Sequence, residues 1–521
     1  MISATQKIPW GPWTHLAFWG LLLAVFLQPF LSARRFGPAG DEYAHLPAGY
    51  SYWRTGEIEL NPQHPPLVKL IAALPLLFLD LNYSEDDLSL GEWRFGRKFL
   101  FTNDADRILF WGRLGPILIS VLLALFVYLW AAKLFGPASG LAALAMYGFM
   151  PVIIGHAQFV ATDVGLAAFS FITLYWLWRF FREEKQKYLI TPGLFLGLTL
   201  GTKFSALVLL PVVLVLFLVG GKAARGSWRQ VLKSLTIIGA LAIAVTYFIY
   251  LFPTDLLYYW HGYQSLYQDR NLNFQFYLNG NFNPNGWWYY FPFAFLLKTP
   301  LAFVILMLLV FAFWRRLKVD PVSRGFVILP PAAFFLASMW GAYNIGVRYI
   351  MPVYPFLIVL ASGLIALDWP KLKQKRLTAI VWLLVGWQAV STLLIFPHYL
   401  AYFSELIGGP ANGYKYLDDS NISWGQDVKL LAEYQSRHPE TKVVYKWYQS
   451  ALDYYGLNNN LAEPTVELWS NPPPARYAVD INYLIRAKYV SLKDNRPELD
   501  WLARYEPVDR IGYGFLVYEV K

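Results

Sequence analysis

Residues 13–33, WTHLAFWGLLLAVFLQPFLSA, form an almost continuous apolar run, and the polar stretch Gly40-Asp41-Glu42-Tyr43-Ala44-His45 follows shortly after it. A second polar element, Asn61-Pro62-Gln63-His64-Pro65-Pro66, comes next. The apolar run is long enough to cross a bilayer. Two adjacent carboxylates and two histidines beside such a span indicate a functional site, because placing charge near hydrocarbon costs desolvation free energy. The structural alternative is that Asp41 caps a helix running to about Trp53, with Glu42 stabilised by the helix dipole.

The composition is that of a membrane protein. Of the 521 residues, 56% are hydrophobic and only 15% are charged, and the mean hydropathy is +0.36; soluble domains carry about 25% charged residues. The net charge is +10, but the basic residues lie in short loops and form no stripe, so we expect no nucleic-acid partner. The chain has no cysteine, which excludes disulfides, thiolate metal sites and a cysteine nucleophile.

Apolar segments recur along the first three quarters of the chain and predict an α-helical polytopic membrane protein with about eleven transmembrane helices. We place the spans at 13–33, 107–130, 138–155, 164–181, 189–202, 204–220, 235–252, 288–314, 326–343, 349–367 and 377–396. The apolar stretch 67–80 is short and contains Pro75, so we interpret it as an interfacial or re-entrant helix. Residues 34–106 then form one large loop. Because many spans follow, the first span is interpreted as an anchor and not as a cleaved signal peptide.

Basic residues mark one set of alternate connections between these spans, whereas the opposite short connections carry little beyond Lys203 and Arg348. The basic set comprises Lys133, Arg182, Lys185, Lys187, Lys222, Arg225, Arg229, Lys233, Arg315, Arg316, Lys318, Arg324, Lys371, Lys373, Lys375 and Arg376. Because basic connections face the cytoplasm, we expect a cytoplasmic N-terminus and a large first loop on the outer face. An odd number of spans places the C-terminal tail outside as well, in a multi-pass protein of the plasma or inner membrane.

The composition changes after residue 396, so we predict a transmembrane domain at 1–396 and an extracytoplasmic α/β tail domain at 397–521. In the tail, residues 427–437 have the pattern of a helix. Three short segments favour strands: 443–447, 489–491 and 514–518. No catalytic motif stands out in the tail.

Several ionisable residues outside the tail fall on the outer face of this predicted topology: Asp41, Glu42, His45, His64, Asp163, Lys203, Lys298 and Arg348. Each has a structural alternative, since a lone lysine commonly reaches the interface with its ammonium group and a lone Asp163 can cap a helix. Their occurrence on one face favours a shared site.

Carboxylates and cations together at an outer membrane surface can serve a group transfer in which a hydroxyl loses a proton and a phosphate leaves. Removing a proton from a hydroxyl needs a positioned carboxylate base. Expelling a lipid phosphate needs lysine or arginine to stabilise the charge that builds on the leaving oxygens. Transfer of a sugar from a polyprenyl phosphate requires both.

The ordered set Asp41-Glu42, His64-Pro65-Pro66-Leu67, Thr202-Lys203 and Val347-Arg348-Tyr349 resembles the protein O-mannosyltransferases. More broadly the chain is similar, over about residues 13–396, to glycosyltransferase family 39 and the bacterial aminoarabinose transferases, which share the C-type glycosyltransferase (GT-C) fold. The tail stretches Leu417-Asp418-Asp419-Ser420-Asn421 and Trp424-Gly425-Gln426-Asp427 resemble uncharacterised bacterial members.

The resemblance implies transfer, with inversion, from a polyprenyl-monophosphate sugar donor to an acceptor hydroxyl on a protein, lipid or glycan. It implies Asp41 as the general base and Glu42 as its catalytic companion, with His64, Asp163, Lys203, Lys298 and Arg348 binding substrate. Gln63 stands where the aminoarabinose transferases carry a glutamate associated with a metal. Because an amide is a poor zinc ligand, we predict no metal site of that kind and leave assistance by a divalent cation open.

Two rivals come from other classes of protein. A transporter or flippase of lipid-linked sugars predicts essential charges near the bilayer midplane and broken helices in both halves of the chain. A membrane scaffold predicts that Asp41 and Glu42 both tolerate alanine. A nearer alternative is an oligosaccharide transferase or ligase of the same fold.

Overall fold

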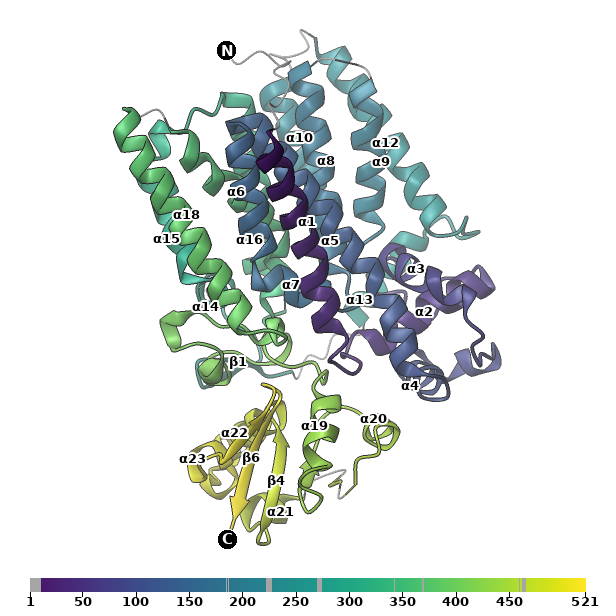
Figure 1. Ribbon diagram of the computed structural model, residues 1–521. Coiled ribbons are helices and arrows are strands. Elements are labelled where there is room, and N and C mark those ends of the chain that lie inside the picture. Colours follow the sequence, from purple (N-terminus) through teal and green to yellow (C-terminus); the bar gives the residue numbers. More distant parts are fainter. Residues whose placement is uncertain are drawn as a thin grey trace.

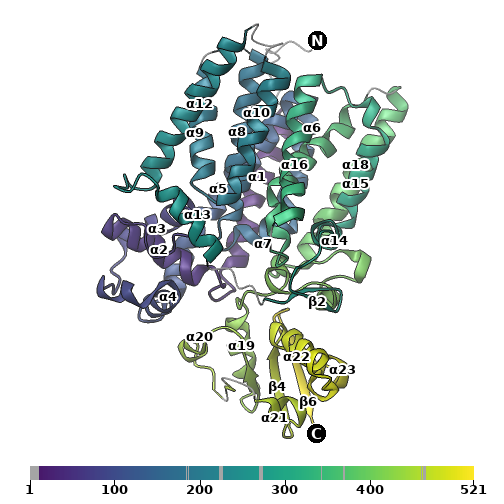
Figure 2. The same ribbon diagram turned by 180° about the vertical axis from the view of Figure 1, so that it is seen from behind.

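The computed structural model describes residues 11–183, 185, 187–221, 227–268, 274–341, 343–367, 370–458, 460–461 and 465–521. Helices run side by side through most of the molecule, and a small mixed domain lies below one end of them (Figure 1). The start of α1 (Pro12–Ala33) lies at the far end of the bundle from the C-terminus, in both views (Figures 1 and 2).

Seven helical segments among the described residues are long and apolar enough to cross a membrane. They are α1 (Pro12–Ala33), α5 (Ala105–Phe135), α8 (Asp163–Glu183), α12 (Trp228–Ile249), α16 (Pro321–Gly341), the run of η6 (Val347–Val353), α17 (Tyr354–Ser362) and η7 (Gly363–Ala366), and α18 (Lys371–Leu394). These helices confirm the predicted polytopic helical fold.

Two further spans result if each of two bent helix pairs crosses once, which gives nine among the described residues. The pairs are α6 (Pro137–Gly148) with α7 (Pro151–Ala157), bent by 59°, and α14 (Tyr290–Lys298) with α15 (Leu301–Ala312), bent by 116°. A proline follows each break, and the residue before it, Met150 or Thr299, is extended, because the ring disfavours helical backbone in the preceding residue.

The other two predicted spans, 189–202 and 204–220, fall on shorter apolar helices. They are α9 (Lys187–Leu200) and the run of η3 (Phe204–Val208), α10 (Leu209–Leu216) and the π-helical turn η4 (Phe217–Gly221). The connection at η5 (Trp314–Arg316) carries predicted basic residues, whereas Lys222 and Arg225 lie outside the described residues.

The large first loop is folded into helices that lie beside the end of the bundle nearest the tail (Figure 1). It contains α2 (Glu42–Thr55), α3 (Leu67–Ala73), η1 (Leu74–Phe78), η2 (Asp86–Leu90) and α4 (Glu92–Phe101). Helix α2 occupies the predicted position after Asp41. Glycine lets these backbones approach closely: a Cβ on Gly96 of α4 would lie 1.7 Å from the carbonyl oxygen of Tyr43 in α2.

The aromatic loop after α12 contains α13 (Tyr258–Gln268) and a two-stranded antiparallel hairpin of β1 (Phe276–Leu278) and β2 (Asn281–Asn283). Asn279 and Gly280 form its turn, both at positive φ, as a two-residue hairpin turn of this composition requires.

The tail begins with four 3-10 turns and continues as a four-stranded sheet with helices against it. The turns are η8 (Tyr399–Ala401), η9 (Glu405–Ile407), η10 (Pro410–Lys415) and η11 (Asp419–Asn421). The strands are β3 (Lys442–Val444), β4 (Ala475–Asp480), β5 (Asp509–Ile511) and β6 (Phe515–Val520), in the order β3-β4-β6-β5, with only the β3–β4 pair parallel. The helices are α19 (Val428–Gln435), α20 (Gln449–Tyr454), α21 (Val466–Ser470), α22 (Ile481–Asp494), η12 (Pro497–Leu499) and α23 (Trp501–Arg504).

Most of the helices and strands predicted for the tail are confirmed. The predicted helix is α19, and β3 and β6 overlap two predicted strands, but the strand predicted at 489–491 is wrong because these residues lie in α22. Ile481, Leu484 and Ile485 are buried at helical spacing, and the side chain of Asp480 caps the helix by accepting from the N–H of Asn482. A short apolar run does not by itself distinguish strand from helix.

Candidate functional site

Asp41 forms an ion pair with Arg348, a residue far away in the sequence. Asp41 occupies the N-cap position of α2, yet its side chain makes no capping hydrogen bond. Instead, Nη1 of Arg348 donates to Oδ2 of Asp41 at 2.5 Å. The carboxylate therefore faces a cation from η6 and does not serve as the helix cap that the structural alternative requires.

Two more predicted residues extend this ion pair. Nη1 of Arg348 lies 3.6 Å from Oδ2 of Asp163, the first residue of α8. Nζ of Lys203, just after α9, donates to Oδ1 of Asp163 at 2.7 Å. Asp41, Arg348, Asp163 and Lys203 thus form one chain of alternating charges, which we call the ion-pair cluster. Its side chains differ in exposure: that of Asp41 is 26% exposed and that of Asp163 only 2%.

Hydrogen-bonding capacity remains unused inside the cluster. Nε of Arg348 and Oδ2 of Asp163 are both buried without a hydrogen-bond partner. A buried polar atom without a partner costs free energy, and in a native structure it requires an explanation such as a ligand. Arg348 therefore retains a donor that an anion entering the site can use.

The cluster keeps Asp41 ionised. Burial alone would raise the pKa of the Asp41 carboxyl, but the positive charge of Arg348, with smaller contributions from His45 and Lys203, lowers this pKa below its usual value. At neutral pH the two carboxylates and two cations of the cluster balance one another.

The rings of His45 and His64 lie together, with centroids 5.0 Å apart, and His45 interacts electrostatically with Asp41. Nδ1 of His45 contacts the carbonyl oxygen of Val160 at 3.2 Å. Burial lowers the pKa of His45 to about 4, although Asp41 opposes the shift, and burial also lowers the pKa of His64 well below its usual value. Both rings are therefore neutral at pH 7. Nδ1 of His64 is buried without a hydrogen-bond partner.

Glu42 faces away from the cluster and pairs with Arg113 of α5. Nε and Nη2 of Arg113 donate to its two carboxylate oxygens at 2.8 and 2.6 Å, and the N–H groups of Ala39 and Val160 add bonds of 2.9 and 3.0 Å. Both oxygens of this fully buried carboxylate are thus occupied. The geometry gives Glu42 the task of fixing the start of α2 against α5.

Lys298, at the end of α14, does not contact the ion-pair cluster directly. Its buried Nζ donates to the carbonyl oxygens of Leu400 and Asn421 at 2.8 and 2.5 Å and lies 4.2 Å from the ring centroid of Phe403. Lys298 therefore anchors the start of the tail to the helical bundle.

Sequence reasoning missed several residues around the site. The ring of Trp424 covers the guanidinium of Arg348 at 4.5 Å, and the side chain of Asn421 accepts from the N–H of Val347. The buried Nζ of Lys69 donates to the carbonyl oxygens of Asn61 and His64, both at 2.7 Å, and so holds the loop that carries His64. Two features of the sequence could have indicated them. Lys69 is a lone lysine in an apolar helix, and Asn421 and Trp424 lie in a tail stretch that is dense in polar residues.

The side chain of Gln63 contacts Glu92. Its amide nitrogen donates to both carboxylate oxygens of Glu92 at 2.8 Å. No group of three or more histidine, aspartate or glutamate side chains within the described ranges is arranged to hold a metal ion.

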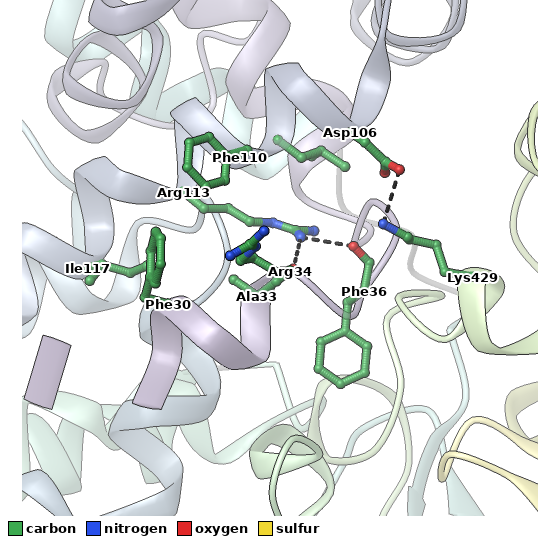
Figure 3. A pocket seen from close by; sticks show the side chains of 10 residues that line it. Phe30, Ala33, Arg34, Phe36, Asp106, Phe110, Arg113, Ile117 and Lys429 are labelled. Atoms are coloured by element: carbon green, nitrogen blue, oxygen red, sulfur yellow. Dashed lines mark hydrogen bonds and ion pairs between the residues drawn. The ribbon is translucent and has the colours of Figure 1, made fainter. Parts of the chain in front are cut away.

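A cavity of about 220 Å³ lies between the end of α1, the start of α5 and α19 (Figure 3). Phe30, Phe110 and Ile117 form its apolar side, and Arg34, Arg113 and Lys429 line it with charge. Arg113 also donates to backbone carbonyls here, and Lys429 pairs with Asp106 at 3.0 Å. No residue of the ion-pair cluster lines this cavity.

The Glu42–Arg113 pair predicts a defect of stability. Glu42→Gln leaves the buried Arg113 without its counter-charge, which costs about 3–5 kcal/mol, so we expect a lower melting temperature in lipid. Arg113→Gln added to Glu42→Gln should destabilise the protein by less than the sum of the two single variants. A Glu42→Gln protein with wild-type stability but no transfer would instead place Glu42 in the chemistry.

The buried His45 predicts a pH dependence of stability. Between pH 6.5, its ordinary pKa, and about 4, the unfolded chain binds a proton that the folded chain does not. Stability therefore falls as the pH drops through this window, by no more than about 3 kcal/mol from this residue. In His45→Asn an amide replaces Nδ1 opposite Val160, and we expect a smaller loss of melting temperature between pH 7 and 4.5 than in the wild type. Equal losses would contradict the assignment.

Comparison with known proteins supplies the family context. Residues 102–250 match the family described as "Dolichyl-phosphate-mannose-protein mannosyltransferase". No curated protein sequence matches the chain. Among solved structures, apo ArnT from Cupriavidus metallidurans is 14% identical with a TM-score of 0.51, and the same enzyme bound to undecaprenyl phosphate is 16% identical with a TM-score of 0.50; both matches cover 98% of each chain.

A third similar structure is the apo oligosaccharyltransferase of Archaeoglobus fulgidus, at 13% identity and a TM-score of 0.51. That match covers 91% of this chain and 71% of the archaeal one. The shared architecture confirms the fold predicted from the sequence, and the match at 102–250 adds the family's sequence pattern. The chain is therefore a membrane protein with the GT-C glycosyltransferase fold of these structures, and residues 102–250 carry the sequence pattern of the mannosyltransferase family.

Proposed function

We propose that this protein transfers a sugar from a polyprenyl-monophosphate donor to an acceptor hydroxyl at the outer face of the plasma or inner membrane, with inversion. The observation that carries the proposal is the ion-pair cluster, in which a partly exposed, ionised Asp41 lies against a guanidinium with a donor to spare. The similar ArnT structure with undecaprenyl phosphate supports a lipid phosphate as ligand.

In the proposed reaction Asp41 accepts the proton of the acceptor hydroxyl, whose oxygen forms a bond to the anomeric carbon. The bond from that carbon to the phosphate oxygen breaks on the opposite face of the sugar, and its electron pair stays on the polyprenyl phosphate. Arg348 and Lys203 stabilise the charge that develops there. His64, with its unpartnered Nδ1, is available to a sugar hydroxyl or phosphate oxygen.

Exposure distinguishes the candidate bases. The side chain of Asp41 is 26% exposed, against 2% for Asp163 and none for Glu42. A general base must come within hydrogen-bond reach of the proton it takes, and Asp41 is the carboxylate of the three that an acceptor from the aqueous side can reach. Asp163 then holds Arg348 and Lys203 in place.

The proposed orientation puts the first loop and the tail outside, where they lie at one end of the molecule (Figure 1). In this orientation an acceptor on a protein, lipid or glycan approaches the site from the aqueous side. Lys298 acts on the site through the tail in this account, since its ammonium is bonded to backbone carbonyls. A divalent cation has no assigned step.

A transporter of lipid-linked sugars is the second candidate, and the two bent helix pairs favour it because they match its predicted broken helices. Against it, the ion-pair cluster joins the first outer-loop helix to the starts of α8 and η6, at one end of the bundle. An oligosaccharide transferase of the same fold differs in the donor and acceptor and uses the same site.

Asp41→Asn provides the test of the base. Asparagine keeps the shape and can still accept from Arg348, but it cannot take the proton, so we expect kcat to fall by about 100-fold or more while donor binding is largely kept. The assay follows label from a panel of polyprenyl-phosphate sugars into acceptors, with purified protein in lipid. Asp87→Asn is the matched control, because Asp87 pairs with Lys98 in the same loop and should leave transfer unchanged.

Wild-type transfer by Asp41→Asn would refute the assigned base. Movement of intact donor across the bilayer, with no bond broken, would support the transporter.

A further inference from the structure

One short stretch of the tail, residues 420–424, contacts Arg348, the backbone before Arg348 and the backbone of Gly40, which precedes Asp41. We call it the tail clamp. We propose that Asn421 and Trp424 of this clamp are positioning residues that fix the guanidinium of Arg348 opposite Asp41, so that the tail completes the site. The effect on turnover rests on the function proposed above, whereas the positioning itself does not.

Asn421 fixes the backbone that carries Arg348. Its buried Oδ1 accepts from the N–H of Val347 at 3.0 Å, the first residue of η6. The N–H groups at the start of a helix have no partner within it, so Asn421 satisfies one of them from outside. Its Nδ2 in turn donates to the hydroxyl of Tyr290 at 3.0 Å and to the carbonyl of Asp418 at 2.9 Å.

Ser420 holds the same backbone segment at Ile345, two residues before Val347. Its Oγ donates to the carbonyl of Ile345 at 2.6 Å. The fit leaves no space, because a Cβ on Gly346 would lie only 2.0 Å from that Oγ. Residues 345–347 are therefore held in one position immediately before Arg348.

Trp424 contacts Arg348 with its ring and the residue before Asp41 with its backbone. Its ring lies over the guanidinium of Arg348 at 4.5 Å, within the range of a cation–π interaction. Its carbonyl accepts from the N–H of Gly40, next to Asp41, at 2.8 Å. A shift of Trp424 would therefore change the distance between base and cation.

The clamp is itself anchored to the bundle. Lys298 donates to the carbonyl of Asn421 at 2.5 Å, and residues 420–424 are buried throughout. These contacts join the tail to the spans at the position where the ion-pair cluster forms. They give Lys298, Asn421 and Trp424 a common task that no motif in the tail indicates.

The first measurement is a thermal double-mutant cycle, which needs no activity. Trp424→Leu and Arg348→Gln are made singly and together, and melting temperatures are measured in lipid. We expect the double variant to lose less than the sum of the single losses, because the ring has no guanidinium to hold once Arg348 is replaced. Strictly additive losses would overturn the proposal, whether or not the protein proves to be a transferase.

The second measurement separates positioning from general stability. If transfer is observed, Trp424→Leu should raise the KM for the donor by roughly 3- to 30-fold with a smaller change in kcat, and Trp424→Phe should restore most of it. Trp469→Leu, at a buried tryptophan that packs on Trp501, should lower the melting temperature with an unchanged KM. An unchanged KM in Trp424→Leu would overturn the proposal. If Trp424→Leu does not fold, Trp424→Met, which also removes the aromatic ring, replaces it in both measurements.

Discussion

The guanidinium of Arg348 between Asp41 and Asp163 is the interaction around which the rest of the structure is arranged. Each charge comes from a separate part of the chain: α2, the start of α8, the end of α9 and η6. Burying an unpaired charge costs several kcal/mol, so these segments can meet only if all four charges arrive together. The charge balance of the ion-pair cluster thus constrains how the outer loop fits against the spans.

The balance of charges in the ion-pair cluster also accounts for how, in the proposed reaction, one site can hold both a carboxylate base and the leaving phosphate. In the resting state Arg348 lowers the pKa of Asp41. The carboxylate is therefore ionised, but it is also a weak base. On the proposed mechanism an incoming phosphate draws Arg348 and Lys203 toward itself and weakens their hold on the carboxylates. The basicity of Asp41 then rises once a donor is bound, which couples donor binding to activation of the acceptor.

Hydrophobic runs, basic connections and the position of charges within the predicted topology were enough to predict the helical membrane fold. The same reasoning, with the family resemblance, named Asp41, Asp163, Lys203 and Arg348, which the structure brings into contact. This prediction succeeded because charged residues at the ends of spans on the same side of the membrane can lie within contact distance of one another. The GT-C fold predicted from the resemblance is confirmed by similar solved structures.

Other contacts were not predicted, because the sequence can mark a residue as unusual without indicating its partner. Lys298 binds backbone carbonyls, which every residue has. The partner of Glu42 is Arg113 inside the second predicted span, where a charged residue is itself a signal that went unused. The contribution of Trp424 and Asn421 depends on how the tail packs against the spans, and the patterning of single segments does not report such packing.

A structure of the protein in lipid with a bound polyprenyl phosphate would test the central claim most directly. The account predicts the phosphate within hydrogen-bond distance of Nε of Arg348 and Nζ of Lys203, with Asp41 on the side open to solvent. A phosphate bound instead in the cavity beside Arg34 and Lys429, with the ion-pair cluster unchanged, would contradict it.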